Sequence, residues 1–270
     1  MRPLTASDAL VRSLTWQRAA DYLELTKPKI VLMELVTVAV AAVVASSGTP
    51  NLWLIAHTLF GTMLVGAGAS AWNQWLEQHS DALMDRTADR PLPAARLSGP
   101  EAVLSGTAAT LTGVAYLGLL VNLPTAALGA LTWLIYVGIY TPLKSRSLTN
   151  TPVGAVAGAL PILMGWTAVG GRFNLSAATL FLIVFFWQFP HVMAIAWIYR
   201  RQYAAAGIKR LAVADPTGLL AGTVAGVTAL ALVPVSLLPA MIGFAGPVYL
   251  LWALTLSFGY LFCSAVFLLR

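Results

Sequence analysis

Charged residues are scarce in this sequence. Only 10% of its 270 residues are Asp, Glu, Lys or Arg, and 59% are hydrophobic. Soluble domains carry charge on about a quarter of their residues, so an ordinary soluble domain is excluded. Apolar runs near twenty residues recur instead, which is about the length that crosses roughly 30 Å of hydrocarbon. We therefore expect an all-α integral membrane protein with several spans.

Cysteine is almost absent, and the N-terminus lacks the pattern of a cleaved signal peptide. The single cysteine, Cys263, excludes a disulfide framework, and we expect it to be buried as a small apolar side chain. The N-terminal region is polar and has no short apolar core followed by small residues. We interpret residues 1–28 as a cytoplasmic arm leading into an interfacial helix and residues 29–270 as the transmembrane domain.

The apolar runs predict eight transmembrane helices. They are expected at residues 29–47, 53–77, 101–121, 125–141, 152–170, 177–199, 218–238 and 245–268. Long polar segments follow the second and the sixth of these helices. We therefore expect two similar four-helix halves, each with a polar segment after its second helix.

The cations predict the orientation in the membrane. Of the sixteen Lys and Arg residues, fifteen lie in the N-terminal arm, at the first position of the first span (Lys29), in the loops 78–100, 142–151 and 200–217, or at the C-terminus, and Arg172 is the exception. By the positive-inside rule, the N-terminus and these three loops should face the cytoplasm. The net charge of +6 is thus a topology and lipid-headgroup signal, and we expect no nucleic-acid partner.

The polar stretch 73–93 is the most informative part of the chain. Asn73, Glu77 and Asp81 recur every four residues, which places three oxygen-bearing side chains on one face of a helix. Hard oxygen ligands suit Mg²⁺, whose shell is commonly completed by water and substrate phosphates. Arg86 and Arg90 follow, and guanidinium groups bind phosphate oxygens well. The simpler interpretation is a solvated, charged helix end between two spans.

The pattern N-x3-E-x3-D-x2-M-x-R-T-x2-R-P-L in this stretch resembles the first motif of the UbiA-type intramembrane prenyltransferases. Within that family it is most similar to the heme O synthases, or protoheme IX farnesyltransferases. Further stretches agree in the same order: Tyr22–Lys29, Tyr140–Lys144 with Asn150–Ala155, and Trp187–His191. The resemblance covers about residues 22–218.

The resemblance implies an activity and a location. Enzymes of this kind transfer the farnesyl group of farnesyl diphosphate to a vinyl group of heme b with Mg²⁺, and water completes the hydroxyethylfarnesyl side chain of heme O. It also implies a bacterial inner membrane, a cytoplasmic active site, and heme A synthase or terminal oxidase assembly factors as partners. Such enzymes usually have nine spans, whereas eight fit this sequence.

The resemblance also implies roles for individual residues. The metal and catalytic residues would be Asn73, Glu77 and Asp81, and His191 would contact heme. The diphosphate would be bound by Arg86, Arg90, Lys144, Arg146, Arg200 and Arg201.

One departure from the family pattern bears on that assignment. Heme O synthases typically read Tyr-Arg-x-Asp-Tyr after the sixth span, whereas this chain has Gln202 at the acidic position, with Arg201 before it. A lost carboxylate and an added cation both oppose a second Mg²⁺ here. Two outcomes are open: Arg200 and Arg201 hold the diphosphate directly, which we expect because arginine suits phosphate geometry, or the protein is a weak catalyst.

Two other functions compete with heme farnesylation. A prenyltransferase for another aromatic acceptor, such as the quinone precursor 4-hydroxybenzoate, would use the same metal residues; the stretches around Lys27, Tyr140 and His191 favour heme. A transporter would place its polar residues at mid-membrane beside broken helices, whereas here they lie in loops at one face. Glu34, inside the first span, could be neutral, paired or turned into a cavity, and the sequence assigns it no role.

Overall fold

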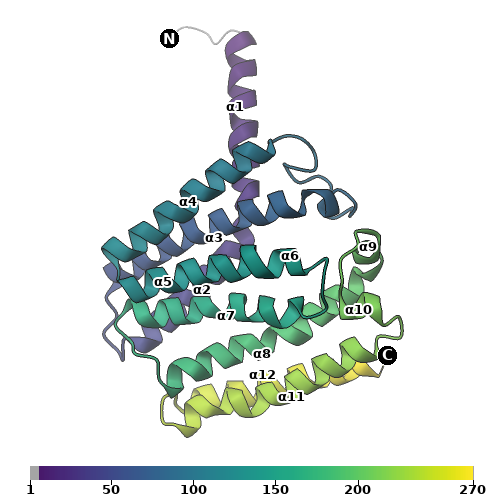
Figure 1. The fold of residues 1–270 in the computed structure, drawn as a ribbon. Coiled ribbons are helices and arrows are strands. Elements are labelled where there is room, and N and C mark those ends of the chain that lie inside the picture. Colours follow the sequence, from purple (N-terminus) through teal and green to yellow (C-terminus); the bar gives the residue numbers. More distant parts are fainter. Residues whose placement is uncertain (1–5, 270) are drawn as a thin grey trace.

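The computed structural model describes residues 6–269 of the chain, with side chains from Thr15 onward (Figure 1). This part is helical and contains no strand. Its elements are α1 (Ala6–Leu25), α2 (Pro28–Ala45), α3 (Leu52–Asp81), α4 (Gly99–Leu120), α5 (Leu123–Trp133), the π-helix η1 (Leu134–Tyr140), α6 (Thr141–Leu143), α7 (Asn150–Ala168), α8 (Leu175–Ile198), α9 (Arg200–Ala205), α10 (Leu211–Ala214), α11 (Leu219–Met241) and α12 (Pro247–Leu268).

Eight segments of the described chain are long and apolar enough to cross a membrane, which confirms the predicted all-α, multi-pass fold. They are α2, α3, α4, the continuous run Leu123–Leu143 of α5, η1 and α6, then α7, α8, α11 and α12. Their bounds agree with the predicted spans to within four residues. The long segments 82–98 and 199–218 follow the second helix of each half, as expected.

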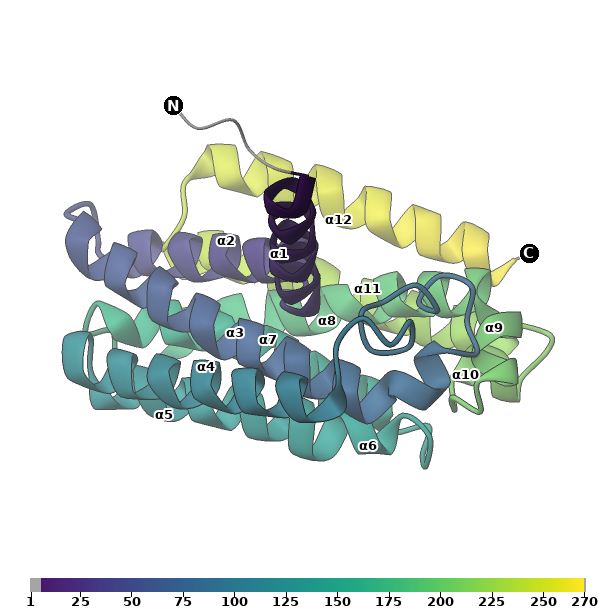
Figure 2. The same ribbon diagram turned by 90° about the horizontal axis from the view of Figure 1, so that it is seen from above.

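The spans lie side by side and their connections gather at two ends (Figures 1 and 2). Extensive packing joins α3 to α4, α2 to α7, and α8 to α11, while α12 packs mainly on α11. The segments 82–98, 144–149 and 199–218 share one end, which we call the loop end. Helix α1 runs at a steep angle to the spans, the direction that an interfacial helix would take. Arg2, Arg12 and Arg270, which contribute to the predicted charge asymmetry, lie outside the described side chains.

Small residues allow the spans to approach closely. A β-carbon added at Gly68 of α3 would lie 2.5 Å from the carbonyl oxygen of Gly106 in α4. A β-carbon at Gly165 of α7 would lie 2.1 Å from the carbonyl oxygen of Val38 in α2. Helix association in lipid relies on such van der Waals contacts. Lipid tails are as apolar as the side chains, so the hydrophobic effect does not drive helices together there.

The fourth span changes its helical type before it reaches the loop end. Residues Leu134–Tyr140 form a π-helix, and the Thr141 hydroxyl donates a hydrogen bond to the carbonyl oxygen of Tyr136 at 2.8 Å. Pro142 contributes to the change, because proline has no N–H and its ring clashes with the carbonyl four residues earlier. Such stretches often occur at functional sites.

The prediction for Cys263 is wrong, because its side chain is exposed on α12. The reason is the position of α12, which packs mainly on α11 and leaves most of its surface uncovered. An apolar run alone does not show whether a span faces lipid or protein.

Candidate prenyl diphosphate site

The loop end is held together by contacts between segments that are distant in sequence. Arg210 donates from Nη1 to Oδ1 of Asn150 at 2.8 Å, and the Lys209 amide donates to the carbonyl of Lys144 at 2.8 Å. On the other side, Arg96 forms ion pairs with Asp21 and Glu24 of α1, at 2.6 and 2.7 Å. The loops are therefore folded against one another and against α1.

Asn73, Glu77 and Asp81 lie on the last turns of α3, and the structure brings a basic side chain to each. The Lys27 ammonium donates to Oδ1 of Asn73. The Nζ of Lys144 lies 2.6 Å from Oε1 of Glu77, and an Nη1 of Arg90 lies 2.6 Å from Oδ2 of Asp81. Asn73 and Asp81 are almost completely buried. Helix α3 continues to Asp81, one turn beyond the predicted span, which keeps all three side chains on one face.

The Glu77–Lys144 pair is the centre of this cluster. Its Glu77 and Lys144 side chains are 13% and 14% exposed, and Oε1 of Glu77 is buried at 2.6 Å from Nζ of Lys144. Burial lowers the pKa of Lys144, but the Glu77 carboxylate and nearby phenols outweigh it and raise the pKa above its ordinary value. Lys144 is thus held as a cation beside the carboxylate.

Lys27 is a site residue to which the sequence analysis gave no role. It lies between α1 and α2 in the left-handed backbone region, with φ of 51°, and Pro28 begins the next helix. This turn directs its ammonium to Asn73. Burial, with Arg90 and Lys144 close by, lowers the pKa of Lys27 to about 7. The Thr-Lys-Pro-Lys stretch was the available signal, but nothing in it indicates the partner.

Arg210 was also missed. It is 7% exposed, and its Nη2 donates to the Tyr140 hydroxyl at 3.2 Å. Burial lowers the pKa of Arg210, but Tyr140 and other neighbours outweigh this and raise it. The ring of Tyr140 in turn lies 4.6 Å from Nζ of Lys144. Arg210 therefore positions Tyr140, which packs against the Lys144 ammonium. Its position in a loop gave no indication of burial.

The remaining predicted cations lie at the loop end, and only Arg146 lines a cavity together with residues of this cluster. Arg146 is exposed on its rim. Arg86 lies over the ring of Tyr199 at 4.9 Å, and Arg200 over Trp197 at 4.1 Å. Arg201 is exposed and has no hydrogen bond or ion pair with the described residues.

His191 and Gln202 have local partners. The exposed His191 ring stacks on Trp187, with centroids 4.9 Å apart and planes at 17°. Gln202 donates from Nε2 to Oδ2 of Asp85 at 3.4 Å, which joins α9 to the segment after α3. The structure brings Asn73, Glu77, Asp81, Arg90 and Lys144 into one cluster, while His191 and Gln202 lie outside it.

The residues of the α3 face fit a magnesium ion. Among the described residues, no three His, Cys, Asp or Glu side chains form a metal cluster, so two carboxylates and one amide are the available protein ligands. This is the small, hard-oxygen set that Mg²⁺ uses when phosphates and water complete its shell. Oε1 of Glu77 is buried and pairs with Nζ of Lys144 at 2.6 Å, so a metal would take this oxygen in exchange for the ammonium. A cavity of about 240 Å³, lined by Glu77, Ser80 and Lys144, adjoins the face.

A second cavity of about 290 Å³ lies deeper between the spans, and we call it the chamber. It is lined by residues of α2, α3, α5, η1, α7 and α8, most of them apolar. Ile30 and Met33 of α2 are each 62% exposed and Trp187 of α8 is 44% exposed, so the chamber opens sideways between these helices. Ser70, one turn before Asn73 on α3, also lines it, which connects the chamber to the metal-binding face.

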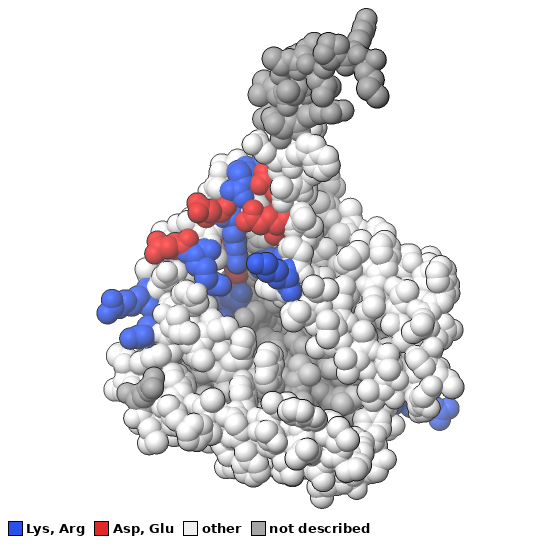
Figure 3. All heavy atoms as spheres, turned by 180° about the vertical axis from the view of Figure 1, so that it is seen from behind, with Lys and Arg blue, Asp and Glu red and all other residues white. Residues whose placement is uncertain are grey.

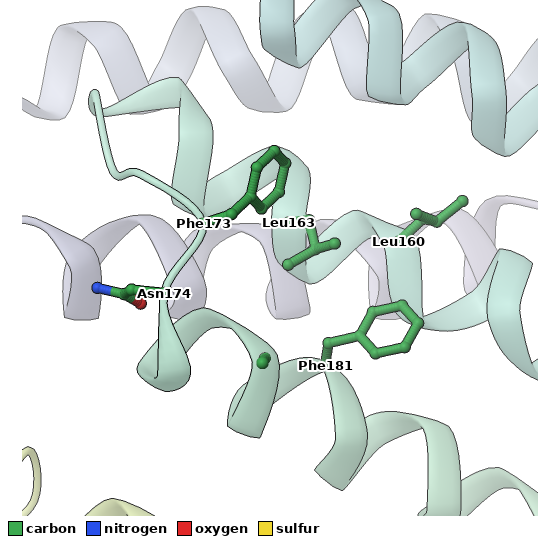
Figure 4. A pocket seen from close by; sticks show the side chains of 6 residues that line it. Leu160, Leu163, Phe173, Asn174 and Phe181 are labelled. Atoms are coloured by element: carbon green, nitrogen blue, oxygen red, sulfur yellow. The ribbon is translucent and has the colours of Figure 1, made fainter. Parts of the chain in front are cut away.

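A third cavity, of about 420 Å³, lies away from the loop end (Figure 4). Leu160, Leu163, Phe173 and Phe181 line it, and the nearby Asn174 caps α8 by accepting from the amide of Ala177 at 2.9 Å. Its lining contains no ionisable side chain. This cavity therefore has no cation to balance the charge of a diphosphate.

Figure 3 shows how unevenly charge is distributed on one face of the molecule. Basic and acidic side chains gather in one region, next to a hollow in the surface, and most of the remaining face is uncharged. A cluster of ion pairs at one end of the spans, beside an apolar chamber, suits a substrate with an anionic head and a hydrocarbon tail.

Comparisons with known proteins agree with this geometry. Residues 35–270 match the UbiA prenyltransferase family. A protoheme IX farnesyltransferase of Solibacter usitatus is 40% identical over 252 residues, covering 90% of this chain and 86% of the relative. One of Rhodopirellula baltica is 46% identical over 201 residues, covering 73% and 69%.

Solved structures show the same fold. A digeranylgeranylglyceryl phosphate synthase superposes with a TM-score of 0.78 at 16% identity, covering 94% of this chain and 88% of the other. A UbiA homolog from Archaeoglobus fulgidus bound to DMAPP and Mg²⁺ gives a TM-score of 0.71 at 18% identity, covering 92% and 96%. The family match covers most of this chain, and the curated relatives are 40% and 46% identical to it. The chain therefore belongs to the UbiA prenyltransferase family.

Proposed function

We propose that this prenyltransferase transfers the farnesyl group of farnesyl diphosphate to a vinyl group of heme b, giving heme O. The observation that carries the proposal is the α3 face of Asn73, Glu77 and Asp81, surrounded by cations at the inner end of a lipid-open chamber. Identity of 40% and 46% to protoheme IX farnesyltransferases supports heme as the acceptor. Heme A synthase and oxidase assembly factors remain predicted partners.

Asn73, Glu77 and Asp81 would hold Mg²⁺, the metal bound in the Archaeoglobus homolog. The metal would neutralise charge on the departing diphosphate. The cations now paired with this face, Lys27 and Lys144, have donors free to turn toward phosphate oxygens once the ligand residues bind metal. The amino groups would then exchange the α3 face for phosphate oxygens, while the metal binds the α3 face. Charges would stay balanced within the cluster when the substrate enters.

The chamber would hold the hydrocarbon and exclude bulk water. Allylic cations react with water unless they are shielded, and a lining dominated by residues such as Val65, Ala69 and Val184 provides that shielding. The opening between α2 and α8 would let the farnesyl tail and the apolar edge of the porphyrin enter from the bilayer. A porphyrin is too large for about 290 Å³, so only its vinyl edge would enter the chamber.

Acceptor choice tests the proposal. Purified protein in lipid nanodiscs is given radiolabelled farnesyl diphosphate and Mg²⁺ with either heme b or 4-hydroxybenzoate. We expect label to enter heme and not the phenolic acid. Transfer to 4-hydroxybenzoate alone would replace heme farnesylation with an aromatic-acceptor reaction.

The orientation is part of the proposal, with the loop end in the cytoplasm of a bacterial cell. In a Cys263→Ser background, Ser147→Cys should react with an impermeant thiol reagent only from the cytoplasmic side, and Ser47→Cys only from outside. These positions flank opposite ends of the spans. Labelling of both from one side, or the reverse pattern, would contradict the proposed orientation.

Arg201 provides a further test of the diphosphate site. It is exposed on α9 with no described partner, so its guanidinium is free to bind phosphate. Arg201→Ala should weaken farnesyl diphosphate binding several-fold by calorimetry, whereas Arg172→Ala, an exposed arginine at the opposite end, should not. Equal affinity in the Arg201 variant and the parent would remove Arg201 from the site.

A further inference from the structure

Glu34 is an ionisable residue inside the first span that the diphosphate site does not use. Its side chain is part-buried and lines the chamber. Its backbone carbonyl accepts from Thr37, but no described residue pairs with its carboxyl group. Burying a carboxyl group within a membrane span without a partner costs free energy. Such a residue is therefore a candidate for a functional role.

The packing around Glu34 makes room for this carboxyl group. A β-carbon added at Gly66 of α3 would lie 3.0 Å from Oε2 of Glu34, so the carboxyl group rests against a glycine. Gly66 precedes Asn73 by seven residues, which places Glu34 about 10 Å along α3 from the metal-binding face, at about 1.5 Å per residue. The carboxyl group is therefore about 10 Å from the metal-binding face, on the side of the chamber.

A second polar group of the chamber is oriented by the protein. Gln188 donates from Nε2 to the carbonyl oxygens of Ala155 and Val184, at 3.0 and 3.1 Å, and this fixes which end of its amide is nitrogen. Its Oε1 has no described hydrogen bond, and Gly158 leaves room for it. The chamber thus contains a carboxyl group and an amide oxygen without described partners, and each can accept a hydrogen bond from water.

We propose that Glu34 is the general base that delivers water to the heme side chain. The inference rests on the proposed function. Bond formation between farnesyl C1 and the terminal vinyl carbon breaks the C–O bond to diphosphate and leaves a cation on the vinyl carbon attached to the porphyrin. Water oxygen adds to that carbon, its proton passes to the Glu34 carboxylate, and Glu34 returns the proton to solvent. The sum is heme b, farnesyl diphosphate and water giving heme O, diphosphate and one proton.

The test separates water addition from carbon–carbon bond formation. Full-length protein in nanodiscs is incubated with heme b, farnesyl diphosphate, Mg²⁺ and heavy-oxygen water, and both diphosphate release and the mass of the heme product are measured. Glu34→Gln keeps the shape and cannot accept the proton. We expect continued diphosphate release but roughly 10²-fold less label entering the product, in the range of one general base. The main product should be lighter than heme O by one water.

The controls make failure of either idea visible. Glu24→Gln, on a glutamate of α1 outside the chamber, should give the parent product, and Glu34→Asp should partly restore the label. Gly66→Ala, which crowds Oε2, is a second route to the same product change if Glu34→Gln folds poorly. Unchanged label in Glu34→Gln, or equal loss of diphosphate release and label in the folded variant, would overturn the role of Glu34. Absence of any farnesylated heme with the parent protein would instead overturn the proposed function.

Discussion

Glu77→Gln and Asp81→Asn are each expected to lower farnesyl transfer by at least about 10²-fold while heme binding persists. Both substitutions keep the shape of the side chain and remove the charge that binds metal and balances Lys144 or Arg90. Loss of one preorganised electrostatic contact in a water-poor site typically costs about 3 kcal/mol of transition-state stabilisation. Steady-state kinetics at saturating Mg²⁺ measure the loss, and the heme absorption spectrum reports binding.

A matched control distinguishes this face from a solvated helix end. Asp89→Asn changes an exposed carboxylate in the segment after α3 and should leave turnover near that of the parent. Near-normal turnover in Glu77→Gln or Asp81→Asn at saturating Mg²⁺ would support the simpler interpretation of a charged loop. A common loss in all three variants would indicate a nonspecific charge effect.

Lys144→Met is expected to lower both activity and stability, and a second substitution should restore only stability. Without Lys144, the Glu77 carboxylate is left in a poorly hydrated site. We expect a stability loss of about 2 kcal/mol, below the cost for a fully buried pair because both side chains retain some exposure. The specificity constant kcat/KM for farnesyl diphosphate should fall roughly 10²-fold, since a phosphate-binding cation is also lost.

The double variant Lys144→Met with Glu77→Gln removes both charges together. Its stability to denaturant in detergent micelles should recover most of the loss, because no buried charge is left unpaired. Its activity should stay low. Stability losses that simply add in the double variant would show that Glu77 and Lys144 do not act as a pair.

Much of the fold followed from local sequence signals. Apolar length predicted the eight spans, and the four-residue spacing of Asn73, Glu77 and Asp81 predicted their common face. The exposure of Cys263 could not be predicted from the sequence, because burial within a bundle depends on which helices are central. The π-helix after Trp133 had only Pro142 as a signal, and proline commonly ends or kinks a helix instead.

The site was predicted less completely than the fold. Arg90 and Lys144 were predicted and lie in the cluster, whereas Lys27 and Arg210 were missed although both are buried near it. Their roles depend on how a turn and a loop fold back on distant partners, and helical periodicity carries no information on that. Glu34 was visible in the sequence as an anomaly, but its relation to Gly66 required the packing of α2 on α3.

The mass of heme recovered after a single incubation tests the central claim most directly. Purified protein is mixed with heme b, farnesyl diphosphate and Mg²⁺, and the extracted heme is analysed by mass spectrometry beside a sample lacking Mg²⁺. We predict that heme gains one farnesyl and one hydroxyl group, with diphosphate released in equal amount, only in the complete mixture. Heme of unchanged mass, while farnesyl diphosphate is consumed with another acceptor, would contradict the assignment of this chain as a heme farnesyltransferase.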